Sequence, residues 1–186
     1  RVDSKLDYSL SIYTQGTDYH DVFNRKINKL KKFLKDIDNN IEIKSYVDTG
    51  PILDRAIAER AGLGWIGKNN NLINKNFGSY LFLGEILTNI EIEPDEEVEN
   101  LCDDCKKCLN ACPGNALVEK YHIKPERCIG YLTQKKGIIS EKEREMIGNN
   151  LWGCDRCQIV CPYNKDIPFN IHPSFSGSLD KDLSEI

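Results

Sequence analysis

The sequence predicts an α+β protein in which a cysteine-free α/β region is followed by a cysteine-rich module. All eight cysteines of the 186-residue chain lie between Cys102 and Cys161. The residues before them alternate between strand-like and helix-like apolar patterns. The acidic stretch from Pro94 to Glu99 lies between the two parts and is typical of a solvated linker. We therefore expect a first domain over residues 1–94, a second over 95–173 and a polar tail over 174–186.

Composition narrows the class of protein. Apolar residues make up 40% of the chain and charged residues 29%, as in folded globular proteins rather than disordered ones. No apolar run approaches the ~20 residues of a membrane helix, and no apolar signal-peptide core follows Arg1, so we expect neither a membrane span nor an export signal. The net charge of −4 argues against a nucleic-acid binder that relies on bulk positive charge.

The first region has recognisable periodicities. Alternation from Asp7 to Thr14 predicts a strand, and β-rich residues from Ile41 to Val47 predict a second, shorter one. Between them, from Tyr19 to Asp38, apolar residues recur every three or four positions, which predicts an amphipathic helix. Its lysines lie largely outside the apolar stripe. We interpret them as a solvated face, with contact to phosphate as the alternative.

Turn residues mark the elements that follow. Pro51 suits the first turn of a second helix, which we expect to end near Ala61 because Gly62 follows. Residues 62–67 match the G-x-G-x-x-G dinucleotide pattern, but they follow a helix instead of a strand, so we interpret them as a helix end and a turn. The apolar run from Ser79 to Thr88 predicts a buried strand.

The cysteines form two related motifs and one isolated residue. The motifs are Cys102-x2-Cys105-x2-Cys108-x3-Cys112-Pro113 and Cys154-x2-Cys157-x3-Cys161-Pro162, with Cys128 between them. The first is the bacterial ferredoxin run, whose fourth cysteine ligates the other cluster of a two-cluster protein. The second lacks its own first cysteine, and Cys128 can supply it. We therefore predict a bacterial-type ferredoxin-like module with two [4Fe–4S] clusters, one held by Cys102, Cys105, Cys108 and Cys161, the other by Cys112, Cys128, Cys154 and Cys157.

Two other uses of the cysteines compete with this one. Disulfides would need an oxidising compartment, which no signal peptide supports. Two zinc sites are the second alternative, although zinc ribbons pair two CxxC knuckles and rarely use a CxxCxxCxxxCP run. Clusters that exchange ligands lie close together, so they can relay single electrons to an acceptor in the cysteine-free region.

Asp48 is the candidate catalytic residue of the first region. It lies after a predicted strand and before a predicted helix, where an aspartate can act as a helix cap. It can also act as a proton donor at the edge of a sheet, where sites collect in α/β folds. Both readings stay open. Lys135 and Lys136, between the cysteine motifs, are further candidates for contact with an anionic substrate.

Several of these segments together resemble the epoxyqueuosine reductase family. They are Asp18-Tyr19-His20, Val47 to Pro51, Ala58 to Asn69, Gly78-Ser79-Tyr80, Glu85 to Thr88, Cys102 to Pro113, Arg127-Cys128-Ile129 and Trp152 to Cys157. The resemblance implies a nitroreductase-like, corrinoid-binding α/β domain portion joined to the two-cluster module, in an enzyme related to reductive dehalogenases.

The resemblance also implies an activity. Such enzymes reduce the epoxide of epoxyqueuosine to queuosine at the wobble position of tRNAs for Asn, Asp, His and Tyr, the last step of queuosine synthesis. The cofactors implied are two [4Fe–4S] clusters and base-off cob(II)alamin, with a flavodoxin or ferredoxin as external electron donor. A cytoplasmic monomer is expected.

By the same resemblance, Asp48 is the proton donor and also contacts the corrinoid. The other corrinoid-contacting positions implied are Ser11, Lys68, Asn69, Leu72, Leu83, Cys154 and Asp155. Family members carry further chain on both sides of this stretch, so we expect weak binding of cobalamin or tRNA by residues 1–186 alone. Two alternatives to this activity remain: a two-cluster electron-transfer protein without its own catalysis, and a dehalogenase-like corrinoid reductase acting on a small molecule.

Overall fold

The computed structural model describes residues 8–119, 122–167 and 172–175 of the chain. Its longest helix is α1 (Tyr19–Ile37), which begins where Asp18 Oδ1 accepts a 2.8 Å hydrogen bond from the backbone N–H of His20. The predicted helix is thus confirmed. Its buried residues are Val22 and Ile27, whereas Ile37 of the apolar stripe is 65% exposed.

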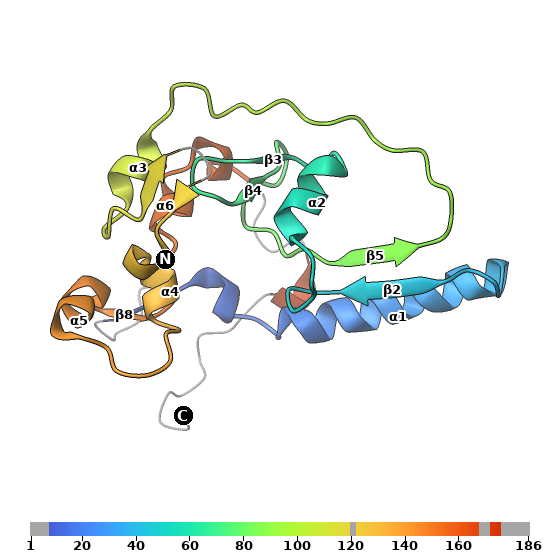
Figure 1. The fold of residues 1–186 in the computed structure, drawn as a ribbon, viewed down its shortest axis with the longest axis horizontal. Coiled ribbons are helices and arrows are strands. Elements are labelled where there is room, and N and C mark those ends of the chain that lie inside the picture. Colours follow the sequence, from blue (N-terminus) through green and yellow to red (C-terminus); the bar gives the residue numbers. More distant parts are fainter. Residues whose placement is uncertain (1–7, 120–121, 168–171, 176–186) are drawn as a thin grey trace.

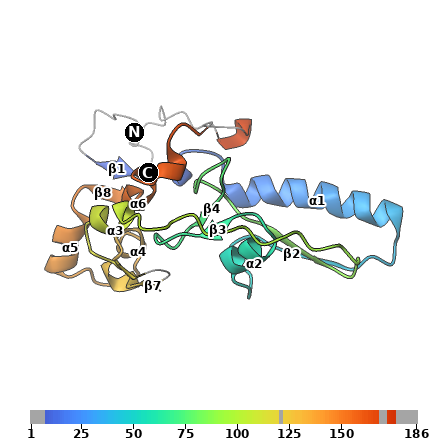
Figure 2. The same ribbon diagram turned by 90° about the horizontal axis from the view of Figure 1, so that it is seen from above.

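Strands β2 (Ile43–Tyr46) and β5 (Glu85–Thr88) pair antiparallel and run alongside α1 (Figures 1 and 2). Tyr46 pairs with Glu85 at one end of this ribbon. The first predicted strand of the pair is confirmed. The second is wrong over residues 79–84, where the chain is irregular because Ser79 bonds to the cysteine-rich module instead of to a neighbouring strand.

Helix α2 (Asp54–Arg60) begins three residues after Pro51, later than predicted, and ends before Gly62, whose φ of +69° stops it as expected. A hairpin of β3 (Trp65–Ile66) and β4 (Leu72–Ile73) follows. Residues 62–67 therefore follow a helix, as predicted, and they lead into a hairpin.

Residues 89–100 contain no helix or strand and cross from β5 to the cysteine-rich module as a long arc (Figure 1). All residues from Pro94 to Glu99 are exposed, as expected of an acidic linker.

The beginning of the described chain lies against the cysteine-rich module. Strand β1 (Ser9–Leu10) pairs in parallel with β8 (Asn150–Trp152), and a 3-10 helix, η1 (Ile12–Thr14), follows it. The predicted strand from Asp7 to Thr14 is therefore wrong beyond Leu10, because Ile12 N–H bonds to the Asp155 side chain instead of to a strand. Asp7 itself lies outside the described residues.

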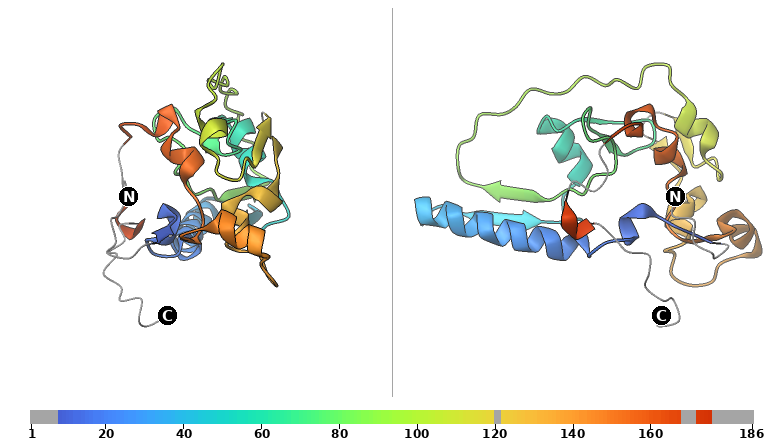
Figure 3. Two further views of the ribbon diagram at one scale, coloured as in Figure 1. Left: turned by 90° about the vertical axis from the view of Figure 1, so that its left-hand side faces the viewer. Right: turned by 180° about the vertical axis from the view of Figure 1, so that it is seen from behind.

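The cysteine-rich module consists of short elements joined by turns (Figure 3). Its helices are α3 (Lys107–Ala111), α4 (Ile129–Leu132), α5 (Glu141–Ile147) and α6 (Arg156–Ile159), its strands besides β8 are β6 (Leu117–Glu119) and β7 (His122–Ile123), and its 3-10 helices are η2 (Pro125–Arg127) and η3 (Pro162–Asn164). A further 3-10 helix, η4 (Pro173–Phe175), is described near the chain end. Residues 176–186 of the predicted tail lie outside the described part.

A hydrophobic core joins the two regions. Trp65, Ile73 and Cys161 are buried together, and Tyr163 meets the Trp65 ring edge-on at 4.9 Å between centroids. The core therefore includes a predicted cluster ligand, which couples folding of the hairpin to the position of that thiol.

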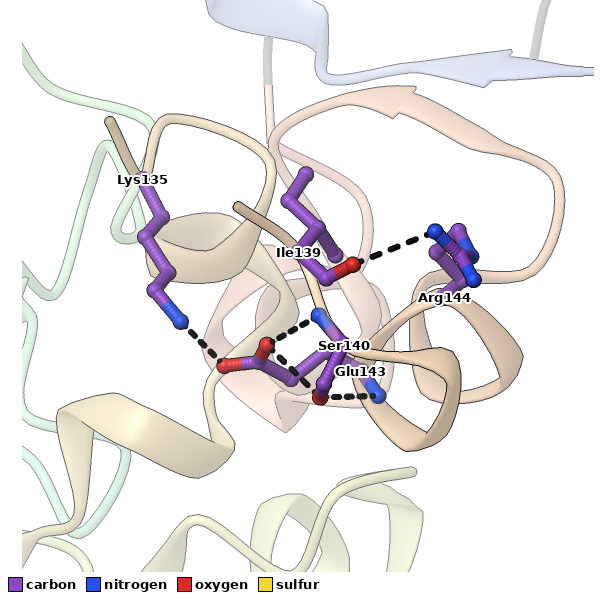
Figure 4. Close-up of polar contacts among 5 residues, drawn as sticks. All are labelled: Lys135, Ile139, Ser140, Glu143 and Arg144. Atoms are coloured by element: carbon purple, nitrogen blue, oxygen red, sulfur yellow. Dashed lines mark hydrogen bonds and ion pairs between the residues drawn. The ribbon is translucent and has the colours of Figure 1, made fainter. Parts of the chain in front are cut away.

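Helix α5 begins with a capping box. Ser140 and Glu143 bond reciprocally, and Glu143 also forms a 2.6 Å ion pair with Lys135 (Figure 4). The Lys135 ammonium thus already has an anionic partner inside the protein.

None of the helices in the described ranges combines the length and the apolar character that crossing a bilayer requires.

Candidate functional site

The first predicted ligand group comes together at the core between α3 and η3. The thiol of Cys108 lies within electrostatic range of Cys102, Cys105 and Cys161. Burial, followed by these neighbouring thiols, raises the pKa of Cys108. The turn from residue 102 to 105 is closed by a 3.0 Å bond from Cys105 N–H to Cys102 C=O. Cys108 thus lies near the other three thiols that the sequence assigns to the same cluster.

The second predicted ligand group lines a cavity of about 160 Å³. Cys112, Cys128, Cys154 and Cys157 all face it, from α3, α4 and the segment around α6. All eight cysteines are free of disulfides. A cavity lined by four thiols is suited to a compact, thiolate-ligated inorganic group.

The two CxxxCP sequences occupy equivalent places. Cys108 and Cys157 each lie within a short helix, and Cys112 and Cys161 each follow that helix directly before a proline. Helices α3 and α6 pack against each other. The first and second ligand groups are therefore neighbours, and Cys157 lies within electrostatic range of Cys108 as well as Cys112.

A close backbone approach brings Cys112 to Cys128. A Cβ placed on Gly114 would lie 1.9 Å from the carbonyl oxygen of Arg127, which leaves room only for glycine. Lys124 N–H donates a 2.8 Å bond to Ala116 C=O across the same approach. Gly114 is not among the residues predicted from the sequence, although its place directly after the Cys-Pro pair is a signal for a tight turn.

The thiol of Cys157 is poorly placed to ionise by itself. Burial and the neighbouring thiols raise the pKa of Cys157 to about 12. Such a thiol stays protonated at neutral pH unless a bound cation compensates the thiolate charge. This donor set fits iron.

Two of the predicted corrinoid-contacting residues bond to each other. Ser11 Oγ donates a 2.6 Å hydrogen bond to Asp155 Oδ1, and Ile12 N–H donates one of 2.7 Å to Asp155 Oδ2. Asp155 is therefore fixed next to Cys154. Ser11 is 5% exposed and lies so close to Gly153 that a Cβ there would be 2.5 Å from the Ser11 Cβ.

The other predicted contacts differ in how they are placed. Asn69 is 5% exposed, faces the cavity of the second thiol group, and its Nδ2 has no partner within the described residues. Lys68 donates instead to the carbonyl groups of Asp103 and Cys105. Leu72 is buried in β4, and Leu83 lies half-buried before β5.

Asp48 is exposed at the centre of a tight turn. Thr49 N–H bonds to Val47 C=O at 2.6 Å, and the φ of Asp48 is +60°, so the residue sits in a three-residue turn of strained type. Tyr19 Oη donates a 2.9 Å hydrogen bond to Asp48 Oδ2. Helix α2 starts later, with Leu53 as its N-cap and no side-chain capping bond, so Asp48 does not cap it.

A short segment connects Asp48 to the second thiol group. Ser79 Oγ donates to Gln158 Oε1 at 2.9 Å, next to Cys157. Three residues further, the Phe82 ring stacks on Tyr19 at 4.5 Å. Three residues span at most about 10 Å, so the tyrosine that holds Asp48 lies a short distance from the cysteine-rich module.

Sequence reasoning also missed a buried acid near Asp48. Glu85 is 7% exposed at the start of β5, and its carboxyl group bonds to that of Asp54 at the start of α2. The signal was an acidic residue inside an otherwise apolar predicted strand. Burial, followed by the Asp54 carboxylate, raises the pKa of Glu85 to about 7.

Two family models match parts of the chain. The model for the 4Fe-4S double cluster binding domain matches residues 101–164, and the model for epoxyqueuosine reductase QueG, DUF1730, matches residues 2–49. The module therefore binds two iron–sulfur clusters. This excludes zinc sites and disulfides as the use of its cysteines.

Two curated relatives match most of this chain. An epoxyqueuosine reductase from Bacillus subtilis (strain 168) is 49% identical over 158 residues, which are 85% of this chain and 41% of that protein. One from Escherichia coli (strain K12) is 40% identical over 173 residues, 92% of this chain and 45% of that protein. The chain thus spans less than half the length of these relatives.

Solved structures match the fold. An epoxyqueuosine reductase crystallised with a tRNA-Tyr epoxyqueuosine-modified stem loop has a TM-score of 0.88 and 46% identity, covering 92% of this chain and 45% of that one. One from Bacillus subtilis, with its aspartate catalytic loop swung out of the active site, has a TM-score of 0.87 and 44% identity, with the same coverage. The chain is a relative of the epoxyqueuosine reductases and corresponds in sequence and fold to about half of one.

Proposed function

We propose that the protein reduces epoxyqueuosine in tRNA to queuosine, the last step of queuosine biosynthesis. The observation that carries this proposal is the match, over 92% of this chain, to an enzyme crystallised with an epoxyqueuosine-modified tRNA stem loop. The free thiols gathered in two adjacent groups supply the redox part of such a site.

In this proposal Cys102, Cys105, Cys108 and Cys161 hold one cluster, and Cys112, Cys128, Cys154 and Cys157 hold the other. The neighbourhoods of Cys108 and of the cavity support this division. The contact between α3 and α6 keeps the groups adjacent, which suits one-electron transfer between them. An external flavodoxin or ferredoxin is the electron donor that we expect.

Cobalamin is the second cofactor that we propose, and it would supply the strong reductant for the epoxide carbon when bound. The chemistry of one buried and one half-buried group fits such a ligand. The Asn69 amide is a buried donor that lacks an acceptor within the described residues, and Asp155 is held in one orientation by Ser11 and Ile12. Asn69, Cys154 and Asp155 are therefore the residues that we expect to face it, together with the Leu72 backbone and Leu83.

Asp48 is the proton donor to the oxygen that leaves the epoxide carbon. Its carboxyl group is exposed to an incoming substrate, and Tyr19 fixes one of its oxygens, which leaves the other free to act. Protonating that oxygen avoids an alkoxide leaving group, an assistance worth about 10²–10⁴ in rate. The related Bacillus subtilis enzyme, solved with an aspartate catalytic loop swung out, supports a mobile acid in this role.

A basic groove in the described part of the chain could receive the tRNA backbone. Lys31, Lys35 and Lys44 line it with Glu42 as the acidic exception, between α1 and the β2–β5 ribbon. Local positive charge of this kind allows phosphate contact despite the net charge of −4. Contacts from chain beyond these 186 residues would add to it.

The test is anaerobic reconstitution of the full-length protein with iron, sulfide and cobalamin, followed by assay on an epoxyqueuosine-containing tRNA stem loop. We expect queuosine to form, and we expect Asp48→Asn to reduce turnover by about 10²-fold or more while cluster and cobalamin spectra persist. The control is Asp36→Asn, the same change on an exposed carboxylate of α1.

Two results would redirect the proposal. Clusters without cobalamin affinity would make the protein an electron carrier. Cobalamin binding with turnover of small halogenated compounds and none of tRNA would make it a dehalogenase-like reductase.

A further inference from the structure

Glu85 is a buried acid without an adequate partner. It is 7% exposed, and no donor from another described residue reaches Oε1 or Oε2. Asp54 Oδ1 is likewise buried without a donor among the described residues. A buried carboxylate without a hydrogen bond is costly, so the arrangement needs an explanation.

The explanation lies in the contact between these two carboxyl groups. The side chains of Glu85 and Asp54 are within hydrogen-bonding contact of each other. Two ionised carboxylates have only acceptors and cannot bond. The contact therefore requires one proton, which lies between one oxygen of Glu85 and one oxygen of Asp54.

The carboxyl pair lies at the base of the loop that carries Asp48. Residues 47–53 form the loop between β2 and α2 that carries Asp48, and Glu85 is tied to both of its ends. At one end Glu85 pairs through the backbone with Tyr46, the last residue of β2. At the other its carboxyl group bonds to Asp54, the first residue of α2. Between these ends the loop folds back over the Tyr46 ring, where a Cβ on Gly50 would be 2.7 Å from the Tyr46 Cβ.

We propose that Asp54 and Glu85 share a proton that acts as a latch, holding the Asp48 loop in the position where Tyr19 bonds to Asp48. With the proton present, the carboxyl pair closes the base of the loop. When the proton is lost, two buried carboxylates repel each other and the base opens. Asp54 and Glu85 are thus positioning residues. The catalytic meaning of the latch rests on the proposed role of Asp48, but the latch itself does not.

The surrounding charges favour this behaviour near neutral pH. The titratable groups that face Glu85 are Asp54 from α2 and Asp48 from the loop, and both are acidic. No lysine, arginine or histidine in the described part of the chain forms an ion pair with any of the three. Burial and these carboxylates raise the pKa of Glu85 to about 7, so the shared proton is lost near physiological pH.

The experiment measures the loop directly. In the intact, cluster-loaded protein, hydrogen exchange of the Thr49 amide, which donates to Val47 C=O, is compared at about pH 6 and about pH 8.5, as protection factors that remove the intrinsic effect of pH. We expect protection in the wild type to fall about 10-fold or more at the higher pH, while α1 stays protected at both.

Three variants separate a latch from a merely structural acid. Glu85→Gln supplies an amide N–H to Asp54 at any pH, so the loop should stay protected at both pH values. Asp54→Asn supplies an amide N–H to Glu85 in the same way, so the loop should again stay protected at both pH values. Glu97→Gln makes the same change on an exposed linker residue and should leave the wild-type pH dependence intact.

Equal protection of the wild-type loop at the two pH values would overturn the latch, as would a wild-type pH response in Glu85→Gln. These readouts need neither cobalamin nor tRNA. A protein with the expected loop behaviour but no turnover of tRNA would therefore refute the proposed function and leave the latch standing.

Discussion

The phenol of Tyr19, at the start of α1, donates a 2.9 Å hydrogen bond to Asp48 Oδ2, 29 residues away in the chain. The Tyr19 ring stacks on Phe82, at an interplanar angle of 11°. Burial, followed by the Asp48 carboxylate, raises the pKa of Tyr19, so the phenol keeps its proton at neutral pH and remains a donor. One aromatic side chain thus links the candidate acid to the segment that leads into the cluster module.

Tyr19→Phe removes that hydrogen bond and keeps the ring stack. A hydrogen bond to a charged group contributes about 1.5–3 kcal/mol, so we expect kcat to fall by about 10-fold or more, with tRNA affinity unchanged. The measurement is single-turnover reduction of the modified stem loop. Tyr13→Phe is the matched control, because that phenol bonds to Trp152 and not to the acid. Equal losses in both variants would remove Tyr19 from the positioning of Asp48.

Cys128→Ser tests the assignment of the isolated cysteine. Because Cys128 lines the cavity of the second thiol group, we expect the variant to lose about half of its iron and to keep the electron paramagnetic resonance signal of the first cluster. Cys105→Ser should give the complementary loss. If Cys128→Ser retains both signals, Cys128 is not a ligand.

Gly114→Ala tests the backbone approach beneath the second cluster. The added methyl group would collide with the Arg127 carbonyl oxygen and push residue 128 away from Cys112, although every cysteine remains. We expect loss of the second cluster alone, measured by iron content and visible absorbance. Gly130→Ala, where the nearest atom is 3.6 Å away, should retain both clusters. A fully loaded Gly114→Ala protein would contradict this account.

Glu85 should make stability depend on pH in a characteristic direction. Its pKa rises from an ordinary 4.5 to about 7 on folding, so the folded state binds more protons between these values. The free energy of unfolding should therefore decrease as pH rises through this window, by at most about 3 kcal/mol, and level off above it. Glu85→Gln should lack that decrease. Urea unfolding across the window measures it, and a parallel decrease in the variant would contradict the assignment.

Glu143 should act in the opposite direction at acid pH. Its bond to Lys135, and then those to Ser140, lower the pKa of Glu143 to about 2. Its stabilising contribution is therefore complete above pH 4.5 and is lost as pH falls toward 2. We expect Glu143→Gln to unfold at lower temperature than the wild type at neutral pH, with the difference disappearing in acid. A difference that persists at low pH would show that packing, not charge, is responsible.

Much of this protein could be read from residue spacing. Apolar residues every three or four positions determined α1, because a helix must bury one stripe. The CxxCxxCxxxCP run, its shorter copy and Cys128 predicted two clusters, since short spacings bring thiolates to one compact group. Local chemistry of this kind needs no knowledge of the rest of the fold.

Only the tertiary structure decided which distant groups meet. Residues 79–84 read as strand from their apolar character, but long-range bonds from Ser79 to Gln158 and Asn164 made them a connection to the cluster module. From its place between a strand and a helix, Asp48 could be a cap or an acid, and the late start of α2 excludes the cap. Glu85 and Asp54 are 31 residues apart, and their shared proton follows from burial, which one sequence does not encode locally. Spacing determines what a segment can form by itself, whereas contacts between segments determine charge, strain and position at the site.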